Sequence, residues 1–265
     1  MNKFKIEKNK TIQGRTKDFL RPAYYYLKLR WKRFLGLFFS KPMDNIKQIP
    51  IIINNFNRLT YLKQLIEYLE KRGFSNIYII DNASTYPPLL EYYSQCPYKI
   101  FLLKKNIGYL ALWQTDIYKL FYRGYYVYTD PDILPINECP DDFLQKFYDL
   151  LQTHKYSSKA GFSLKIDDIP EYFEKKKQVL EWESQFWNIK VEEGVYEGAI
   201  DTTFALYRPF TKWGGNFYEG HLRTDFPYQV RHIPWYKDQK HLSDEDIYYI
   251  THSKTDTHWT NQLVN

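Results

Sequence analysis

Two carboxylates separated by a single proline follow a run of strand-forming residues. The segment "YYVYTDPDILP" (125–135) places Asp130 and Asp132 directly after aromatic and β-branched residues of high β propensity. Pro131 cannot donate a hydrogen bond to a sheet, so the strand should end near Thr129. Carboxylate oxygens are ligands that hard divalent cations prefer. The pair is therefore a candidate cation site just beyond the end of a strand.

A second Asp-x-Asp, formed by Asp244 and Asp246, has a different explanation. It occurs in "HLSDEDIYYI", where Ser243 precedes Asp246 by three residues. A serine followed three positions later by an acidic residue is typical of a helix N-terminus. We therefore interpret this second pair as part of a helix cap.

The segments around Asp130 predict an α/β fold. Apolar runs typical of strands alternate with stretches of helical periodicity. The predicted strands are 49–54, 76–81, 99–103 and 125–129, and the predicted helices are 59–73, 87–95 and 109–122. In the first helix, Thr60 is a candidate N-cap and Gly73 occupies the position of a C-terminal glycine. This alternation predicts a mainly parallel sheet covered by helices.

Polar residues follow each predicted strand. They are "NNFNR" (54–58), "DNAST" (81–85), "KKNIG" (104–108) and the Asp-x-Asp segment. Each segment taken singly has the composition of an ordinary loop. In a parallel sheet, however, the carboxyl ends of the strands share one edge, which is where ligands bind. The four segments together predict a nucleotide pocket with a hard cation held by carboxylates.

These segments resemble a known enzyme family. "IIINNFNR", "IIDNAST", "NIGYLALW" and "VYTDPDILP", in this order across 49–140, are similar to the N-terminal half of a GT-A fold glycosyltransferase of the family 2-like bacterial type. The later segments "GFSLKIDDIP", "IDTTFALYRP" and "RHIPWYKD" resemble enzymes of bacterial surface polysaccharides, lipopolysaccharide or capsule. The resemblance implies a Rossmann-like GT-A sheet flanked by helices and transfer of a sugar from a nucleotide donor, expected to be UDP-linked.

The resemblance also implies roles for individual residues. Asp81 would read the uracil or ribose, and Asp130 and Asp132 would hold Mn²⁺ or Mg²⁺ with the donor diphosphate. The cation would neutralise the charge that develops on the leaving group. His232 is the candidate third ligand, although packing beside Pro234 and Trp235 explains it equally well. The full set expected around the donor is Asn55, Asn57, Arg58, Asp81, Asn82, Asn106, Gly108 and Asp130, and the weaker histidine candidates are His221, His241, His252 and His258.

The C-terminal half is expected to hold the acceptor, a glycan or a lipid-linked glycan. An inverting enzyme needs a carboxylate that deprotonates the acceptor hydroxyl. Asp201, just ahead of an apolar strand, is the first candidate and Asp168 the second, followed by Glu219 and Asp225. The Glu-Asp pair usual in the family is not recognisable, so a retaining reaction without this base stays open. Trp182, Trp187 and Trp235 are candidates for stacking on sugars or for ordinary core positions.

The first 47 residues have a separate character. They carry 13 Lys and Arg against 3 Asp and Glu, whereas the remaining 218 residues carry 24 against 28. Because the excess of positive charge lies outside the globular part, we do not expect a nucleic-acid-binding domain. Residues 23–41 alternate apolar and basic side chains at helical spacing, with Leu27, Trp31, Leu35 and Phe38 on one stripe. This pattern predicts either a helix on an anionic membrane or one packed on the domain with its basic face solvated.

The expected organisation is thus a basic arm (1–47) followed by a catalytic domain (48–265), with a donor half (48–140) and an acceptor half (141–265). We expect no signal peptide and no membrane-spanning segment, and the two cysteines do not suggest a disulfide framework. A cytoplasmic enzyme, peripheral on the inner face of the cytoplasmic membrane, fits these features. The alternatives are a sugar nucleotidyltransferase, which needs a glycine-rich loop that "NNFNRLT" lacks, and a non-enzymatic membrane- or nucleic-acid-binding module.

Overall fold

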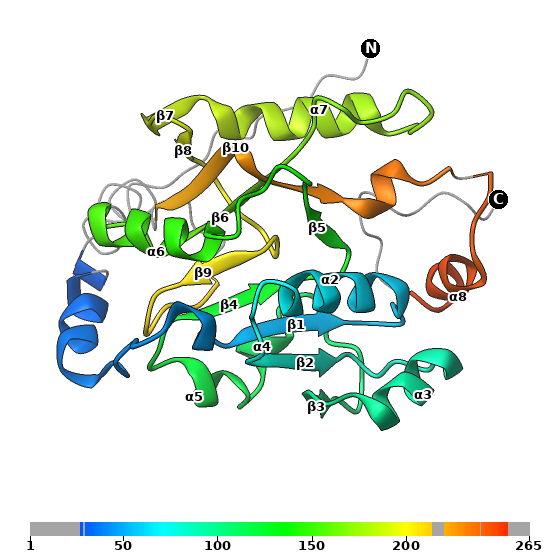
Figure 1. Cartoon of the computed structure of the whole chain (residues 1–265), viewed down its shortest axis with the longest axis horizontal. Coiled ribbons are helices and arrows are strands. Elements are labelled where there is room, and N and C mark those ends of the chain that lie inside the picture. The colour runs from blue at the N-terminus through cyan, green and yellow to red at the C-terminus, as the bar shows by residue number, and fades with distance from the viewer. Residues whose placement is uncertain (1–26, 29, 214–219, 239, 254–265) are drawn as a thin grey trace, which may run out of the picture.

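The computed structural model describes residues 27, 28, 30–213, 220–238 and 240–253, in which a single sheet of ten strands runs through the molecule (Figure 1). The strand order is β3-β2-β1-β4-β9-β6-β10-β8-β7, and β5 pairs with β10. The strands are β1 (Ile51–Asn55), β2 (Ile77–Asp81), β3 (Lys99–Leu102), β4 (Tyr126–Thr129), β5 (Ile133–Pro135), β6 (Lys159–Leu164), β7 (Ile189–Glu192), β8 (Val195–Glu197), β9 (Ala205–Tyr207) and β10 (His221–His232).

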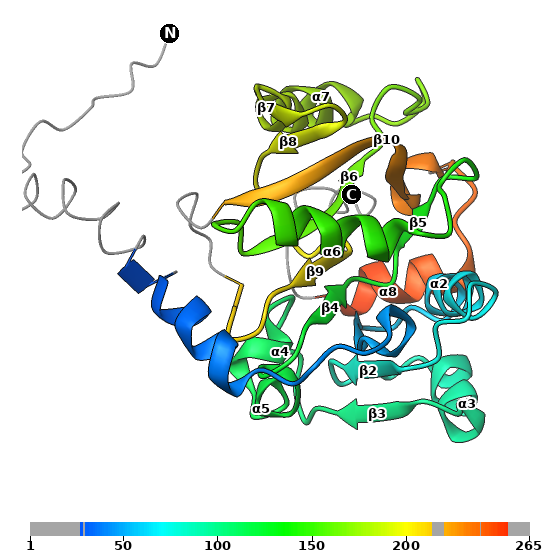
Figure 2. The ribbon, with the colours of Figure 1, turned by 60° about the vertical axis from the view of Figure 1, so that its left-hand side comes forward.

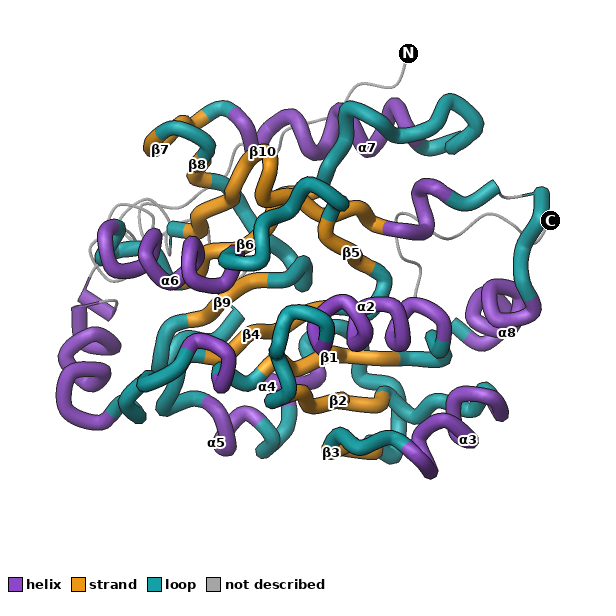
Figure 3. The backbone as a smooth tube through the Cα atoms, in the orientation of Figure 1, coloured by secondary structure: helices purple, strands orange, loops and turns teal. Residues whose placement is uncertain are grey.

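Helices cover both faces of this sheet (Figures 1 and 3). The α-helices are α2 (Thr60–Glu70), α3 (Pro87–Gln95), α4 (Ala111–Gln114), α5 (Tyr118–Phe121), α6 (Phe143–Thr153), α7 (Lys176–Ser184) and α8 (Asp244–His252), and the 3-10 helices are η1 (Ile46–Gln48), η2 (Gln185–Trp187) and η4 (Ile233–Tyr236). The long helices α2 and α6 lie over one face, and the short helices α4 and α5 lie over the other. The predicted α/β class is confirmed.

The four strands expected from the sequence form the parallel part of the sheet. Ile51 of β1 pairs with Ile77 of β2 on one side and with Val127 of β4 on the other, all in parallel. Beyond β4 the sheet is mixed, because β9 runs antiparallel to both β4 and β6. The parallel order β3-β2-β1-β4 brings the polar segments after these strands to one edge, as predicted.

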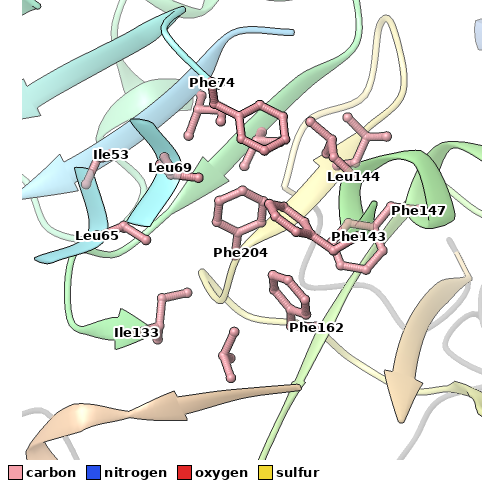
Figure 4. Close-up of a cluster of buried hydrophobic side chains, with 14 of the residues drawn as sticks. Ile53, Leu65, Leu69, Phe74, Ile133, Phe143, Leu144, Phe147, Phe162 and Phe204 are labelled. Atoms are coloured by element: carbon pink, nitrogen blue, oxygen red, sulfur yellow. The ribbon is translucent and has the colours of Figure 1, made fainter. Parts of the chain in front are cut away.

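Alternation along β1 divides the core into two layers. Ile51 and Ile53 belong to the cluster under α2 and α6, whereas Ile52 belongs to the cluster under α4 and α5. Successive side chains of a strand point to opposite faces, so a run of isoleucines is buried on both sides. Figure 4 shows the larger cluster, in which a group of phenylalanines fills the space between β6, β9 and the two long helices.

Two local expectations are wrong. The predicted continuous helix 109–122 is divided into α4 and α5 by an extended residue, Thr115. The Thr115 hydroxyl donates to the carbonyls of Ala111 and Leu112, which competes with continuation of the helix. Thr60 does not cap α2 but is its first helical residue, and Glu245 from α8 accepts hydrogen bonds from its amide and hydroxyl at 2.9 and 2.7 Å.

The described part of the arm begins with a helix at one side of the molecule (Figure 2). Residues 27, 28 and 30–39 are helical, and Arg123 fixes the end of this arm helix by donating to the carbonyl of Phe39 at 2.9 Å. Most of its apolar side chains stay exposed, among them Trp31, Leu37 and Phe38 at 61%, 82% and 67%, whereas Leu35 is half-buried. Of the helices that the structure describes, none has the length and apolar character required to cross a membrane.

Candidate active site

The Asp-x-Asp segment joins two strands that pair with different partners. β4 ends at Thr129, as predicted from Pro131, and the chain then enters β5, which pairs with β10. In this pairing Ile133 lies opposite His232, and Ile233 donates its amide to the carbonyl of Asp132 at 2.8 Å. The His232 Nε2 atom consequently lies 3.4 Å from Asp132 Oδ2. The structure thus brings the candidate third ligand to the Asp-x-Asp pair.

His232 also packs against Trp235, which was the alternative to a role as a cation ligand. Its ring centroid lies 4.9 Å from that of the buried Trp235. Its Nδ1 atom is buried and has no hydrogen-bond partner among the described residues. The two explanations are therefore compatible, because Trp235 fixes the ring while Nε2 faces the carboxylate.

The two carboxylates lie in different electrostatic environments. Burial, and next the charge of Asp132, hold the pKa of Asp130 well above its usual value. Burial also opposes the ionisation of Asp132, but His232 and Arg58 outweigh it, so the pKa of Asp132 is lowered. Thr202 donates a hydrogen bond to the Asp130 carboxylate, and its carbonyl accepts from the Asp130 amide at 3.0 Å. Asp132 therefore ionises more readily than an ordinary aspartate, and Asp130 less readily.

The donor set fits a cation that is shared with a substrate. Within the described ranges, no group of three or more His, Cys, Asp or Glu side chains forms a cation site by itself. Asp130, Asp132 and His232 supply hard oxygen ligands and one imidazole, and such incomplete sets are typical of Mg²⁺ or Mn²⁺ held together with phosphate oxygens. Burial is the main cause of the raised pKa of Asp130, and the second cause, repulsion from Asp132, is the effect that a bound cation would remove.

A cavity of about 490 Å³ opens beside these residues. Asp130, His232 and Asp201 line it together, which places the first candidate base in the same cavity as two of the candidate cation ligands. Trp182, 55% exposed, and Trp213 contribute aromatic walls. Trp235 also lines the cavity, whereas Trp187 packs against Tyr196 with a centroid distance of 5.1 Å. A cavity lined by both carboxylates and aromatic side chains suits a sugar.

A buried lysine holds the segment that presents Asp201. Lys159, 1% exposed, donates from Nζ to the carbonyls of Ile200 and Asp201 at 2.5 and 3.3 Å. The Asp201 carboxyl is exposed to the cavity, yet the surrounding protein reduces its hydration and raises its pKa, against the opposing effects of Lys159 and a hydrogen bond from Trp213. A raised pKa makes this carboxylate a stronger base than an ordinary aspartate.

The other candidate bases lie elsewhere. Asp168 accepts hydrogen bonds from Arg231 and from Tyr236, at 2.5 Å in the latter case, and does not line the cavity. Burial alone would raise its pKa, but Arg231 and Tyr236 lower it. Asp225 accepts a hydrogen bond from the amide of Phe226 and is likewise not part of the cavity wall. Glu219 lies outside the described residues, as does His258.

Most residues expected to contact the nucleotide form the framework of the strand-end loops. Asn55, Asn57, Asp81 and Asn82 are at most 1% exposed. Asp81 accepts from the amide of Ser84 at 2.9 Å and from the hydroxyl of Tyr93 at 3.0 Å. In this arrangement they bind neighbouring loops, and their contact with a nucleotide stays a prediction.

Left-handed backbone occurs at three positions of these loops, Asn57, Ala83 and Gly108. Asn57 has φ of 51°, and its side-chain oxygen accepts from the amides of Thr85 and Tyr86 at 2.7 and 3.0 Å. Gly108 has φ of 82° and donates its amide to Asn106 at 2.8 Å. Asparagine and glycine tolerate this region best. Asn106 is exposed and available to a ligand.

Helix α8 closes over this edge of the sheet. Ser243 and Asp246 form the predicted capping box, but Asp246 also accepts from Arg58 at 2.7 Å in a pair whose side chains are both 6% exposed. The Arg58 guanidinium stacks on Tyr249 at 3.7 Å. Arg58, expected to contact the donor, is thus held between α8 and the Asp132 carboxylate, whose pKa it lowers.

The Glu245 contact to α2 leads to a stability prediction. Glu245→Ala should lower the free energy of unfolding by about 1 to 2 kcal/mol, because it removes the buried carboxylate that accepts hydrogen bonds from the amide and hydroxyl of Thr60 at the start of α2. Asp244→Ala is the matched control, since it removes an exposed carboxylate from the same helical turn. Urea unfolding of both variants measures the difference. Equal losses would show that Glu245 acts only through the charge of the α8 N-terminus.

Several residues of the cavity carried no recognisable signal in the sequence. Arg223 and Glu183 form a buried ion pair of 2.6 Å in its wall, although they are 40 positions apart. His221, by contrast, was one of the weaker histidine candidates; it is buried in the same wall, and its Nδ1 accepts from the amide of Ile200 at 3.4 Å. Burial, and next Lys159, hold the pKa of His221 well below its usual value, so the ring is neutral. Trp213 was not among the tryptophans considered as sugar contacts.

Comparisons with known proteins gave only distant matches. No protein-family model matches the chain, and no curated protein matches its sequence. Solved structures with a related arrangement include GalNAc-T7 with UDP, GalNAc and Mn²⁺, which is 13% identical over 72% of this chain and 44% of its own, with a TM-score of 0.45. The chain therefore spans less than half the length of GalNAc-T7.

Two further structures come from bacteria. TarS 1–349 from S. aureus is 12% identical over 82% of this chain and 69% of its own, with a TM-score of 0.40. Glucosyl-3-phosphoglycerate synthase from Mycobacterium tuberculosis, in complex with Mn²⁺, UDP-glucose and phosphoglyceric acid, is 11% identical over 64% and 62%, with a TM-score of 0.38. None of the three is a close structural match.

Proposed function

We propose that this protein is a GT-A type glycosyltransferase that moves a sugar from a nucleotide donor, expected to be UDP-linked, to a glycan or lipid-linked acceptor. The observation that carries the proposal is the shared cavity of Asp130, His232 and Asp201 at the carboxyl end of β4. The cavity unites a candidate cation site, a candidate base and aromatic walls. These are the parts that transfer of a glycosyl group requires.

Asp130, Asp132 and His232 would hold the Mn²⁺ or Mg²⁺ ion. When bound, the ion supplies positive charge to the diphosphate leaving group. The chain's own contribution is to fix these ligands. The β5–β10 pairing positions His232 against Asp132, and Thr202 orients the Asp130 carboxylate. Arg58 adds a fixed positive charge close to Asp132.

Asp201 would take the proton from the acceptor hydroxyl. Lys159 holds the backbone on both sides of this residue, so its carboxyl is presented to the cavity from a rigid segment. Burial raises the pKa of Asp201, which makes its carboxylate, once ionised, a stronger base than that of an ordinary aspartate. Trp182 and Trp213 would exclude water and stack on sugar faces.

Synthesis of a bacterial surface polysaccharide at the membrane is the biological setting that we propose. The support is the arm helix, whose exposed apolar side chains would enter an anionic lipid surface. A catalytic domain anchored in this way would meet acceptors carried on lipids. The alternative of a nucleotidyltransferase has less support, because the loop after β1 has no glycine and makes its turn at Asn57.

A thermal-shift screen of nucleotide sugars tests the proposal. A donor that binds only the folded state raises stability by RT ln(1 + [L]/Kd), about 2.7 kcal/mol at a hundredfold excess over Kd. We expect UDP-sugars to raise the melting temperature in the presence of Mn²⁺ and much less in its absence. Nucleoside triphosphates alone serve as the control for the nucleotidyltransferase. Stabilisation by a triphosphate and by none of the sugar nucleotides would contradict a glycosyltransferase.

A further inference from the structure

A second large cavity lies between the arm helix and the globular part. This groove has a volume of about 640 Å³. The arm helix contributes Arg33, Phe34 and Leu37 to its walls, and the segment after α6 contributes Lys155. Arg208, which follows β9, lies on the globular side. The groove is separate from the cavity of Asp130 and Asp201, and no part of the proposed transfer reaction uses it.

The groove has a strong excess of positive charge. Its described lining includes five Lys and Arg side chains and no Asp or Glu. Arg208 donates to the carbonyl of Ser157 at 2.7 Å and to those of Leu151 and His154, so its partners are neutral and its charge is not cancelled. Burial lowers the pKa of Arg208, and the nearby charge of Arg33 lowers it further. Two guanidinium groups therefore repel each other across the groove.

An anion is the ligand that this arrangement lacks. Arg33, Lys155 and Arg208 form no ion pair with any carboxylate in the described part of the chain, and Arg33 lies 5.4 Å above the ring of Tyr156. The Arg33 guanidinium can bind phosphate oxygens in a bidentate manner, whereas Arg208, whose N–H groups mostly donate to carbonyls, contributes chiefly its positive charge. A phosphate in the groove would relieve the repulsion between the arginines.

The rim of the same groove is apolar. Phe34 and Leu37 line it, yet they are 49% and 82% exposed. Trp31, Phe38 and Phe39, all more than half exposed, extend this apolar strip along the arm helix. A positively charged groove that continues directly into an exposed apolar strip is complementary to a molecule with a phosphate at one end and hydrocarbon at the other.

We propose that this groove binds the phosphate headgroup of one anionic membrane phospholipid, whose acyl chains lie along the exposed apolar strip of the arm helix. A free phosphate ester would use the cations but would leave the strip exposed, which is why we choose the lipid. The proposal rests on the membrane association included in the proposed function, and it is independent of glycosyl transfer.

The test uses a short-chain lipid in solution, so that binding is measured without a membrane. Dihexanoylphosphatidylglycerol below its critical micelle concentration is titrated into the full-length protein at about 150 mM salt, where the screening length is roughly 8 Å. Arg33→Gln/Lys155→Gln should weaken binding about 30-fold, from about 1 kcal/mol for each of two cations. Neither side chain takes part in a hydrogen bond among the described residues, so this double variant should melt as the wild type does.

Lys28→Gln/Lys177→Gln is the matched control. It removes the same charge, from the arm helix and from α7, at positions that do not line the groove. We expect it to weaken binding less than about threefold, because screening suppresses distant charges. Equal losses in the two double variants would overturn the site, since a diffuse positive field would then explain the binding.

Two further ligands identify the source of the phosphate. Glycerol 3-phosphate should bind at least about tenfold more weakly than the short-chain lipid, because it lacks the hydrocarbon that covers the apolar strip. Equal affinity would overturn the lipid assignment in favour of a soluble phosphate ester. Dihexanoylphosphatidylcholine, which carries no net charge, should also bind weakly, and tight binding of it would contradict a site built on positive charge.

Sedimentation with vesicles separates this proposal from membrane association itself. Wild-type protein should sediment with phosphatidylglycerol vesicles at low salt, whereas a variant that starts at Ile49 should stay in the supernatant. If the wild type sediments but does not bind the short-chain lipid, the groove is not a lipid site although the arm binds membranes. If the wild type does not sediment, membrane association is wrong, and the donor screen still decides on glycosyl transfer.

Discussion

Asp132→Ala is expected to abolish the Mn²⁺-dependent binding of UDP. Of the two carboxylates, Asp132 is the one with the lowered pKa, so it provides the negative charge that attracts a cation. Without it, a diphosphate would face Asp130 with no bridging cation, and the two groups repel each other. Calorimetric titration of UDP with and without Mn²⁺ should show an affinity loss of at least about 100-fold in the presence of the metal, the scale of one broken buried charge contact.

Asp167→Ala is the control for this variant. Its carboxylate is 74% exposed and pairs with Lys165, outside the cavity. It changes the net charge as Asp132→Ala does and should leave the UDP affinity as it is in the wild type. An Asp132→Ala variant that retained both the affinity and its metal dependence would show that the Asp-x-Asp pair is not the cation site.

Asp201→Asn is expected to reduce sugar transfer by at least about 100-fold while the affinity for UDP and Mn²⁺ stays the same. An amide of the same shape keeps the contacts of the cavity wall but cannot accept the acceptor proton, and general bases contribute on this scale. The measurement is the initial rate of UDP release from the donor that the screen identifies, with the acceptor present. Transfer close to the wild-type rate would favour a retaining mechanism or another base.

Two further measurements, the transfer rate of Asp168→Asn and the pH dependence of transfer, test whether the effect is specific to Asp201. Asp168 is bound by Arg231 and Tyr236 away from the cavity, so its variant should lose much less transfer. Because the pKa of Asp201 is raised, wild-type transfer should decline with falling pH earlier than an aspartate of ordinary pKa would cause. A decline that is unchanged in Asp201→Asn would assign the titrating group to another residue.

Local patterns determined the elements that carry these residues. The isoleucines of β1 specify a strand buried on both faces, and Pro131 ends β4 because it has no amide to donate. Ser243 and Asp246 form their capping box within four consecutive residues, and Gly73 follows α2 with φ of 77°. Each of these features depends on neighbours in the chain, so the sequence is sufficient to predict it.

Contacts between distant segments decided the site. His232 reaches Asp132 only because β5 pairs with β10, and Arg58 meets Asp246 across 188 positions of the sequence. Lys159 holds the Asp201 segment from another strand, while the polar residues at the ends of β1 and β2 bind one another. Charge and hydrogen-bonding capacity are properties of a residue type, but their partners are set by strand register and helix packing. The sequence therefore determined which groups stand at the carboxyl edge of the sheet, and only the tertiary structure decided which of them face the cavity.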